Sequence, residues 1–272
     1  VCDGLVDALS RPYAGTWAWV AAMAPDAPAL ARAIEEARCG SAQEEARLRA
    51  LADAPIALEP SAEQSNASYL LDERGLLRGV GEWLLPLRVE LSVFRAPTDN
   101  DRGRGPVDYW GIDASHAMRW ERARLHLLRR RLVSIEEEGA VRRVVERWSP
   151  PAAQFGVTLT WEYAPCRIGE GLARGVSVSA RVAPYGNWPP RVPRLGLRIE
   201  LPGPSWQASW LGETMIGYPD MSVPGTLGCG SADASDLWDV GVRPQEGGHR
   251  AGLEALSLRG EAGGVLILPP PP

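Results

Sequence analysis

Apolar and polar residues alternate along much of the chain after residue 55, and this two-residue period predicts β-strands. Residues 157–163, 176–182 and 195–201 each carry an apolar side chain at every second position. Gly and Pro turns separate these runs, and the turn "DERG" at residues 72–75 offers a Gly for a left-handed conformation. Many short alternating strands with little helix predict an antiparallel sandwich.

Residues 25–54 have a helical period instead. Residues 26–40 begin with a capping Asp, repeat apolar residues at helical spacing and end at a Gly. A second short helix is predicted from Ser41, which forms a capping-box pattern with Glu44 and is followed by Leu48 and Leu51. The sequence therefore predicts a helical pair or a kinked linker ahead of the strands.

Composition narrows the classes of function. The 272 residues are 45% hydrophobic, which is enough to bury a full core, and the net charge is −5. All 29 basic residues are Arg, so the chain has no Lys for a Schiff base, a pyridoxal phosphate or a phosphate loop. An acidic chain whose one basic cluster is "LLRRRL" at 127–132 is not expected to bind nucleic acid. Apolar stretches such as "GVGEWLLPL" are too short for a membrane span, so no membrane partner is expected. The cytoplasm is the favoured compartment.

Cys and His residues show no spacing typical of a metal, redox or triad site. The Cys residues are Cys2, Cys39, Cys166 and Cys229, and the His residues are His116, His126 and His249. We expect free thiols and surface or structural His residues. No cofactor is predicted for this chain.

The stretch "FRAPTDND" at residues 94–101 contains two Asp residues on either side of an Asn. If this segment were extended, Asp99 and Asp101 would lie on one side about 6.5 to 7 Å apart, which is compatible with the carboxyl separation of a glycosidase. The turn-forming residues around them favour another interpretation, in which the carboxylates accept backbone N–H groups. An ion or sugar contact is the third alternative.

Trp is unusually frequent, with eleven Trp residues against two Phe. An indole ring packs well against a pyranose face, but it also fills the core of a sandwich, and the core is the better prediction for most of these residues. Trp188 and Trp238 lie in turn-rich contexts and are the candidates for substrate contact.

Several segments, in order, resemble the C-terminal domain of β-galactosidases in glycoside hydrolase family 2. "FRAPTDND" resembles the signature that opens that domain, and "LLDERGLLRGV" and "PRLGLRIELPG" resemble its strands. "WLGETMIGYPD" followed by "RPQEGGHR" resembles a later pair of motifs, and "DGLVDALSRPYAGTWAW" at the N-terminus resembles the chain leaving the catalytic barrel. Six ordered matches make this resemblance specific.

The resemblance implies a mostly β fold, an antiparallel β-supersandwich of the galactose mutarotase-like type with a short N-terminal helical segment. Residues 1–24 would be the remnant of a barrel exit, 25–54 a helical linker, 55–268 the supersandwich and 269–272 a proline tail. Asp3 matches a position that helps to bind sodium in the family. Arg95 is expected to pair with Asp99 or Asp101 in a charge-assisted bond.

The family's two catalytic Glu residues lie in the barrel, upstream of this chain, and cleavage of a glycosidic bond needs both. We therefore predict the C-terminal part of a β-galactosidase, which hydrolyses terminal β-D-galactosides such as lactose, and we expect the isolated chain to be inactive. Its partners would be a β-galactoside and a catalytic galactosidase chain, with sodium or magnesium in the full enzyme. The alternatives are a carbohydrate-binding or assembly module that complements a separate catalytic chain, and a degenerate gene product.

Overall fold

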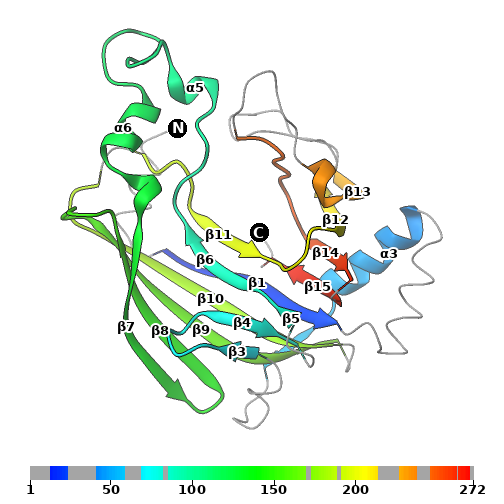
Figure 1. Ribbon diagram of the computed structural model, residues 1–272. Helices are drawn as coiled ribbons and strands as arrows, with labels where there is room; N and C mark the ends of the chain where they lie inside the picture. Colours follow the sequence, from blue (N-terminus) through cyan, green and yellow to red (C-terminus); the bar gives the residue numbers. More distant parts are fainter. Residues whose placement is uncertain are drawn as a thin grey trace.

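The computed structural model describes residues 13–23, 41–58, 69–81, 85–169, 173–188, 191–213, 227–237, 246–261 and 263–269 (Figure 1). The strands are β1 (Tyr13–Met23), β2 (Ile56–Leu58), β3 (Tyr69–Leu71), β4 (Leu77–Val80), β5 (Leu85–Pro86), β6 (Arg88–Ser92), β7 (Arg129–Glu138), β8 (Val141–Ser149), β9 (Gly156–Ile168), β10 (Ala173–Tyr185), β11 (Gly196–Glu200), β12 (Trp206–Glu213), β13 (Leu227–Asp233), β14 (Ala255–Gly260) and β15 (Gly263–Leu268). The helices are α3 (Ser41–Ala52), α5 (Asp99–Arg102) and α6 (His116–Arg122), with short 3-10 turns at Leu125–Leu127 and Ala234–Leu237.

One large antiparallel sheet organises the described part of the chain. Its strand order is β13-β12-β14-β15-β1-β10-β9-β8-β7, and β2 pairs with β9. The long β9–β10 hairpin runs from the Gly156–Tyr185 pair to the Ile168–Ala173 pair. β1 joins the two halves of this sheet, because it pairs with β10 on one side and with β15 on the other.

The position of β1 bears on the predicted domain boundaries. The sequence assigned residues 1–24 to a barrel exit, whereas their described part is a strand inside the main sheet. The strand contains the aromatic residues Tyr13, Trp17 and Trp19 and the β-branched residues Thr16 and Val20, which are types that favour strands. The derivation of this segment from a barrel stays a prediction, as does the boundary at residue 24.

A second layer covers one face of the large sheet. It consists of the three-stranded sheet β3-β4-β5 and the strand pair β6-β11, and Figure 1 shows these strands lying across β1 and β8–β10. The main core lies between the layers. It joins Leu77, Val80 and Val89 of the second layer to Leu159, Trp161 and Val178 of the large sheet.

The alternation read from the sequence is the reason that this core forms. In β9 the side chains of Val157, Leu159, Trp161 and Tyr163 are at most 2% exposed, while the residues between them up to Glu162 are only half-buried. In β10 the buried positions also alternate: Val176, Val178, Ala180 and Val182 are at most 4% exposed. The structure therefore confirms the predicted mostly β, antiparallel sandwich; the finer mutarotase-like assignment stays a prediction.

The predicted "DERG" turn is also confirmed. Gly75 has φ = 72° and donates its N–H to the carbonyl of Asp72 at 2.8 Å. The Asp72 carboxylate accepts the N–H groups of Arg74 and Leu76, each at 2.9 Å, and the Nε–H of Arg78 at 2.8 Å. Partial burial opposes ionisation of Asp72, but these donors outweigh it and lower its pKa. A charged Asp72 thus fixes the turn between β3 and β4.

Helix α3 covers part of the opposite face of the large sheet. Leu48 is fully buried there against Ile168, Leu211, Ala255 and Leu266. The predicted second helix, with its buried Leu48, is confirmed; the predicted helix over residues 26–40 lies outside the described residues. No helix among the described residues is long and apolar enough to cross a membrane.

A buried ion pair between Arg130 of β7 and Glu146 of β8 interrupts the apolar core. Glu146 is 1% exposed, and its carboxylate accepts the Nε–H of Arg130 at 2.7 Å and the indole N–H of Trp148 at 2.7 Å. Close by, the Tyr69 hydroxyl donates to the carbonyls of Tyr163 and Ala140. Burial raises the pKa of Tyr69 to about 12, so this hydroxyl keeps the proton that it donates.

Candidate functional site

The "FRAPTDND" segment is centred on a buried ion pair between Arg95 and Asp101. Nη1 of Arg95 donates to Oδ2 of Asp101 at 2.5 Å, and Nη2 donates to Oδ1 at 3.2 Å. Both residues are buried, at 9% and 6% exposure. A two-point contact between guanidinium and carboxylate fixes geometry as well as charge. The sequence left Asp99 and Asp101 open as partners of Arg95, and the structure assigns Asp101.

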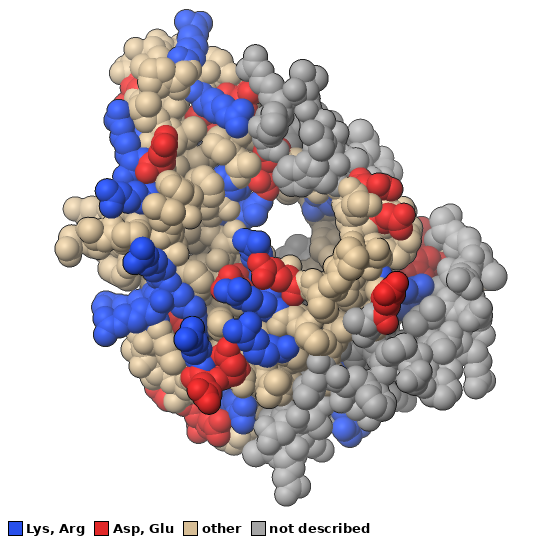
Figure 2. Space-filling model, viewed as in Figure 1, with Lys and Arg blue, Asp and Glu red and all other residues tan. Residues whose placement is uncertain are grey.

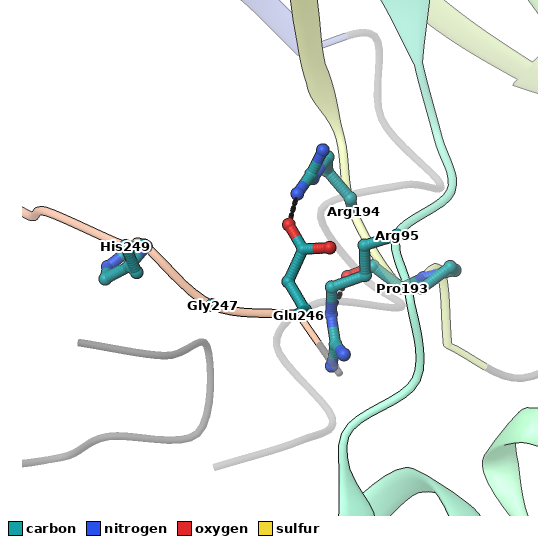
Figure 3. Close-up of a pocket in the computed structure, with 7 residues that line it drawn as sticks. Arg95, Pro193, Arg194, Glu246, Gly247 and His249 are labelled. Carbon is teal, nitrogen blue, oxygen red and sulfur yellow. Dashed lines mark hydrogen bonds and ion pairs between the residues drawn. The ribbon is translucent and has the colours of Figure 1, made fainter. Parts of the chain in front are cut away.

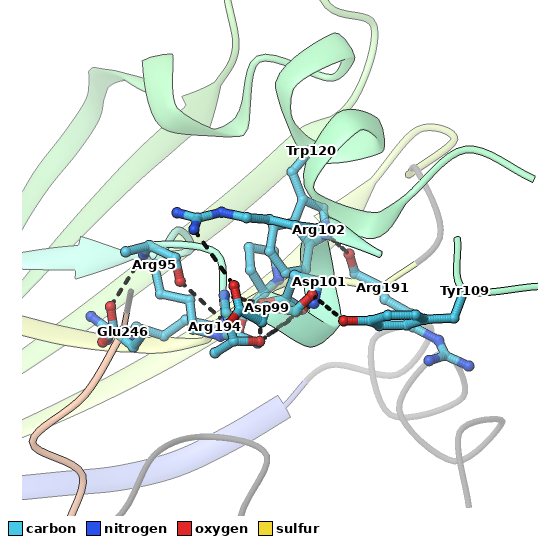
Figure 4. A network of polar contacts seen from close by, with 12 residues as sticks. Arg95, Asp99, Asp101, Arg102, Tyr109, Trp120, Arg191, Arg194 and Glu246 are labelled. Atoms are coloured by element: carbon cyan, nitrogen blue, oxygen red, sulfur yellow. Dashed lines mark hydrogen bonds and ion pairs between the residues drawn. The ribbon is translucent and has the colours of Figure 1, made fainter. Parts of the chain in front are cut away.

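The remaining donors of Arg95 join this segment to distant parts of the chain. Its Nε–H donates to the carbonyl of Pro193 at 3.0 Å, and Nη1 also donates to the carbonyl of Ala96 at 3.1 Å. The guanidinium lies 5.3 Å from the ring centre of Trp120 in α6, close enough for a cation–π contact. Trp120 in turn donates its indole N–H to the carbonyl of Arg191 at 3.0 Å. Figure 4 shows Arg95 and Asp101 at the centre of these contacts.

Thr98 and Asp101 shape the backbone of the turn. Thr98 is the N-cap of α5, and its N–H donates to Oδ2 of Asp101 at 2.8 Å, while its hydroxyl donates to the same oxygen at 2.9 Å. The N–H of Asp101 reaches the Thr98 hydroxyl at 3.4 Å, which completes a capping box. One carboxylate therefore satisfies the cap of the helix and the buried Arg together.

The helical turn separates the two Asp side chains that the sequence singled out. Asp101 is buried against Arg95, whereas the Asp99 side chain is 48% exposed and lies 3.9 Å from Arg102. Residues two apart on a helix point in different directions, so the extended geometry of a paired acid site is not formed. The interpretation as a turn whose carboxylate accepts backbone N–H groups is confirmed for Asp101.

Glu246 links the turn to the segment that precedes β14. Its Oε2 accepts the N–H of Ala96 at 3.1 Å, and its Oε1 forms an ion pair with Nη2 of Arg194. Figure 3 shows Glu246 between Arg194 and Arg95, with His249 farther along the same segment. Arg194 is 40% exposed, and burial and the nearby Arg95 lower its pKa. The sequence offered "RPQEGGHR" as part of a resemblance but gave Glu246 no role; its position in that motif was the available signal.

A cavity of about 400 Å³ opens beside these groups. Arg95, Pro193, Arg194, Glu246 and His249 line it, together with two Gly residues. Figure 2 shows this face of the molecule hollowed near its centre, with basic and acidic side chains at the edge. Because Arg95 directs its donors to Asp101 and to carbonyl oxygens, the charge lining the cavity is already compensated. We therefore assign no ligand to this cavity.

The predicted substrate-contacting and sodium-binding residues fall in different places. Trp188 is half-buried, donates its indole N–H to the carbonyl of Gly156 at 2.9 Å and meets the Phe155 ring edge-on at 5.1 Å. These contacts hold the end of the β9–β10 hairpin, and a role in sugar binding stays a prediction. Trp238 and Asp3 lie outside the described residues. No group of three metal-ligating side chains occurs among the described residues.

The dispersed His and Cys residues also remain apart. His116 stacks on Trp120 at 6.2 Å, and His126 lies 5.7 Å from the ring of Phe94, so both make structural ring contacts. Burial and the nearby Arg191 and Arg119 lower the pKa of His116. Cys166 and Cys229 are free thiols, as predicted, and burial raises the pKa of Cys229. Cys2 and Cys39 lie outside the described residues.

The fold and the site together define a large antiparallel β-sandwich in which the acidic motif stabilises a junction between segments. Comparison with known proteins identifies the family. The family model described as "Beta galactosidase small chain" matches residues 64–267. The Beta-galactosidase of Arthrobacter sp. (strain B7) is 30% identical over 182 residues, which cover 62% of this chain and 17% of the relative.

The family match includes most of the chain, and it contains the Arg95–Asp101 pair and both layers of the sandwich. The chain belongs to the β-galactosidase small chain family. It spans about a sixth of the length of the Arthrobacter relative.

Proposed function

We propose that this chain is the C-terminal, non-catalytic part of a β-galactosidase, and that the assembled enzyme hydrolyses terminal β-D-galactosides such as lactose. The observation that carries this proposal is the family match over residues 64–267. The resemblance to glycoside hydrolase family 2 supports the proposal, because it implies that the two catalytic Glu residues belong to a barrel that precedes this part of the enzyme.

The chemistry of the acidic turn supports a non-catalytic role. A glycosidase needs one carboxylic acid that protonates the leaving oxygen and one carboxylate that attacks the sugar or activates water. Asp101 has its oxygens bound to Arg95 and to the Thr98 cap. The Asp99 side chain is 48% exposed beside Arg102 and does not line the cavity next to the turn. These two residues therefore stabilise the fold and supply neither group.

The role that we propose for the chain is to complete the rim of a galactoside cleft formed mainly by the catalytic part. Trp188 and Trp238 are the residues proposed to contact the sugar, and Asp3 is proposed to contribute to a sodium site. In the full enzyme we propose sodium or magnesium as the metal. Calorimetric titration of the assembled enzyme with galactose, for the wild type and for Trp238→Ala, tests the sugar contact: equal affinities would rule it out.

Hydrolysis of a chromogenic β-galactoside by the pure chain tests the catalytic assignment. We expect no turnover above buffer. Asp99→Asn is the informative variant, because the half-exposed Asp99 is the acid of the motif that can be changed without breaking the buried pair. Turnover by the wild-type chain that is abolished in Asp99→Asn would overturn the non-catalytic role.

A further inference from the structure

The loop between α5 and α6 presents a cluster of apolar side chains to solvent. Trp110 is 84% exposed, Ile112 is 85% exposed and Tyr109 is 46% exposed. We call these three residues the apolar tip. Single apolar residues are common on surfaces, but three exposed apolar side chains within four positions indicate a candidate interaction site. Figure 1 shows the loop projecting beyond the sheets, away from both cores.

Backbone hydrogen bonds hold this loop in a defined conformation. Asp108 accepts the N–H of Ile112 on its carboxylate at 3.1 Å, donates its own N–H to the carbonyl of Asp113 at 2.8 Å, and accepts the N–H of Gly111 on its carbonyl at 3.1 Å. Val107 forms antiparallel bridges to both Arg104 and Ala114. The N–H groups around Asp108, led by that of Ile112, lower its pKa and favour the charged acceptor.

The apolar tip is also anchored to the buried ion pair. The Tyr109 hydroxyl donates to the carbonyl of Asp99 at 3.0 Å, and the N–H of Gly103 donates to the same carbonyl at 3.1 Å. Asp99 begins α5, which is capped through Asp101 and so through Arg95. A loop fixed in this way loses little conformational entropy when its exposed side chains are covered, and this favours binding.

We propose that the apolar tip is the surface through which this chain docks against the catalytic part of a β-galactosidase. The inference rests on the proposed function and adds the residues that make the contact. The chain matches only 17% of the Arthrobacter enzyme, so most of such an enzyme lies outside the matched region and is available to cover the tip. Trp and Tyr are the residue types that dominate binding energy when they enter a pocket on a partner.

The size of the tip fits a central contact within a larger interface. Buried aromatic side chains each remove about 150–250 Å² from water, and a stable protein interface buries about 800 Å² on each partner. The tip alone is therefore too small to form a stable interface, so surface around it must also contribute to the contact. The partner surface that it requires is an apolar recess with a polar rim.

The surroundings of Trp110 disfavour a sugar as the occupant. A sugar platform combines an aromatic face with free polar groups beside it. Here the Asp108 carboxylate accepts the N–H of Ile112, and the Asp113 carboxylate is paired with Arg119. Ile112, the most exposed of the three, offers no group to a hydroxyl. These features suit a protein surface better than a galactoside.

A binding measurement tests the proposal directly. The probe is the β-galactosidase of Arthrobacter sp. (strain B7) made without the region that this chain matches, immobilised after circular dichroism has shown it to be folded. We expect the double variant Trp110→Asp/Ile112→Asp to raise Kd at least about thirtyfold. The matched control is Val133→Asp on β7, which places a charge at another exposed apolar site and should change Kd less than about twofold.

A second readout does not depend on the variants. Amide hydrogen exchange of the wild-type complex should show new protection at residues 108–113 relative to the free chain. If the double variant binds as tightly as the wild type and these amides gain no protection, the docking surface is wrong while the proposed function stands. If the wild-type chain does not bind the probe at all, both the docking surface and the proposed function fail.

Two further outcomes would assign the tip to another occupant. Quenching of tryptophan fluorescence by lactose that is lost in the double variant would make the tip a sugar site. Concentration-dependent sedimentation of the free chain that disappears in the double variant would show that a second copy covers the tip. Either result overturns the proposal, and a simple monomer without lactose quenching supports it.

Discussion

Arg95 and Asp101, six residues apart, form a two-point ion pair in which both side chains are less than 10% exposed. This pair joins the end of the second layer to α5, to α6 through Trp120 and to the Pro193 segment. The "FRAPTDND" motif, whose two Asp residues suggested catalysis, thus joins four segments of the chain.

Replacing Asp101 with Asn should destabilise the chain strongly. The change leaves the Arg95 charge buried without its counter-ion, and removal of one partner of a buried pair costs about 3–5 kcal/mol. Asp99→Asn is the control in the same motif. Its side chain is half-exposed, so we expect a loss of less than about 1 kcal/mol. Urea unfolding followed by tryptophan fluorescence measures both, and equal losses would contradict the central role of Asp101.

Glu146 should have a comparable effect inside the main core. Glu146→Gln removes the charge that faces Arg130, so the free energy of unfolding should fall by about 3–5 kcal/mol. Glu162→Gln is the matched control on the adjacent strand, because its pair with Arg143 is about 40% exposed on both sides. We expect a far smaller change there. The free energies from chemical denaturation should differ several-fold; similar values would mean that the buried pair contributes little.

Two glycines next to the apolar tip offer a matched comparison. Gly103 and Gly105 both have positive φ, 59° and 83°, so Ala is strained at either position. A Cβ at Gly103 would also lie 2.4 Å from the carbonyl oxygen of Val107, while a Cβ at Gly105 would meet nothing within 4 Å. Gly103→Ala should therefore lower Tm more than Gly105→Ala and speed amide exchange at residues 107–113. Equal Tm values would show that the loop moves easily.

His116 should make stability depend on pH. Burial and two Arg neighbours lower its pKa in the folded state, while the unfolded His titrates near about 6.5. As pH falls through this range the unfolded state takes up a proton that the folded state resists, so stability decreases with falling pH and the loss ends below the folded pKa. Above about pH 7.5 both states are neutral and the contribution vanishes.

Urea midpoints measured between pH 7.5 and 5 provide the check. His116→Gln should flatten the curve of midpoint against pH in this range. A slope that persists in His116→Gln would assign the pH dependence to another group.

The regular parts of the fold were accessible from the sequence because each obeys a local rule. The two-residue alternation predicted β9 and β10, and the Ser41–Glu44 capping pattern predicted α3. The junction around Arg95 and Asp101 could be predicted only in part. Arg95 was expected to bind an Asp of the motif, but the choice of Asp101 over Asp99 depends on the short α5 helix, which turns the two side chains apart.

Long-range relationships could not be read from local pattern. Glu246 reaches Ala96 across 150 residues, and β1 enters the sheet between strands that are far from it in sequence. Such pairings depend on which strand edges remain free when the layers assemble. The spacing of residues within either segment does not determine which edges these are. The apolar tip could not be predicted from the sequence for a different reason. Its segment, "DYWGID", looks like an ordinary turn. Only the fold shows that no other described part of the chain covers these side chains.

The strand β1 pairs with β15, a strand that the ribosome makes much later. The ribosome makes residues 13–23 well before residues 263–268, yet β1 and β15 are neighbours in the finished sheet. Until the late segment has left the exit tunnel, one side of β1 remains open to pairing with other nascent chains. Slow joining of distant segments lengthens that interval, so we expect soluble yield in a heterologous host to rise with chaperone supply and at lower growth temperature.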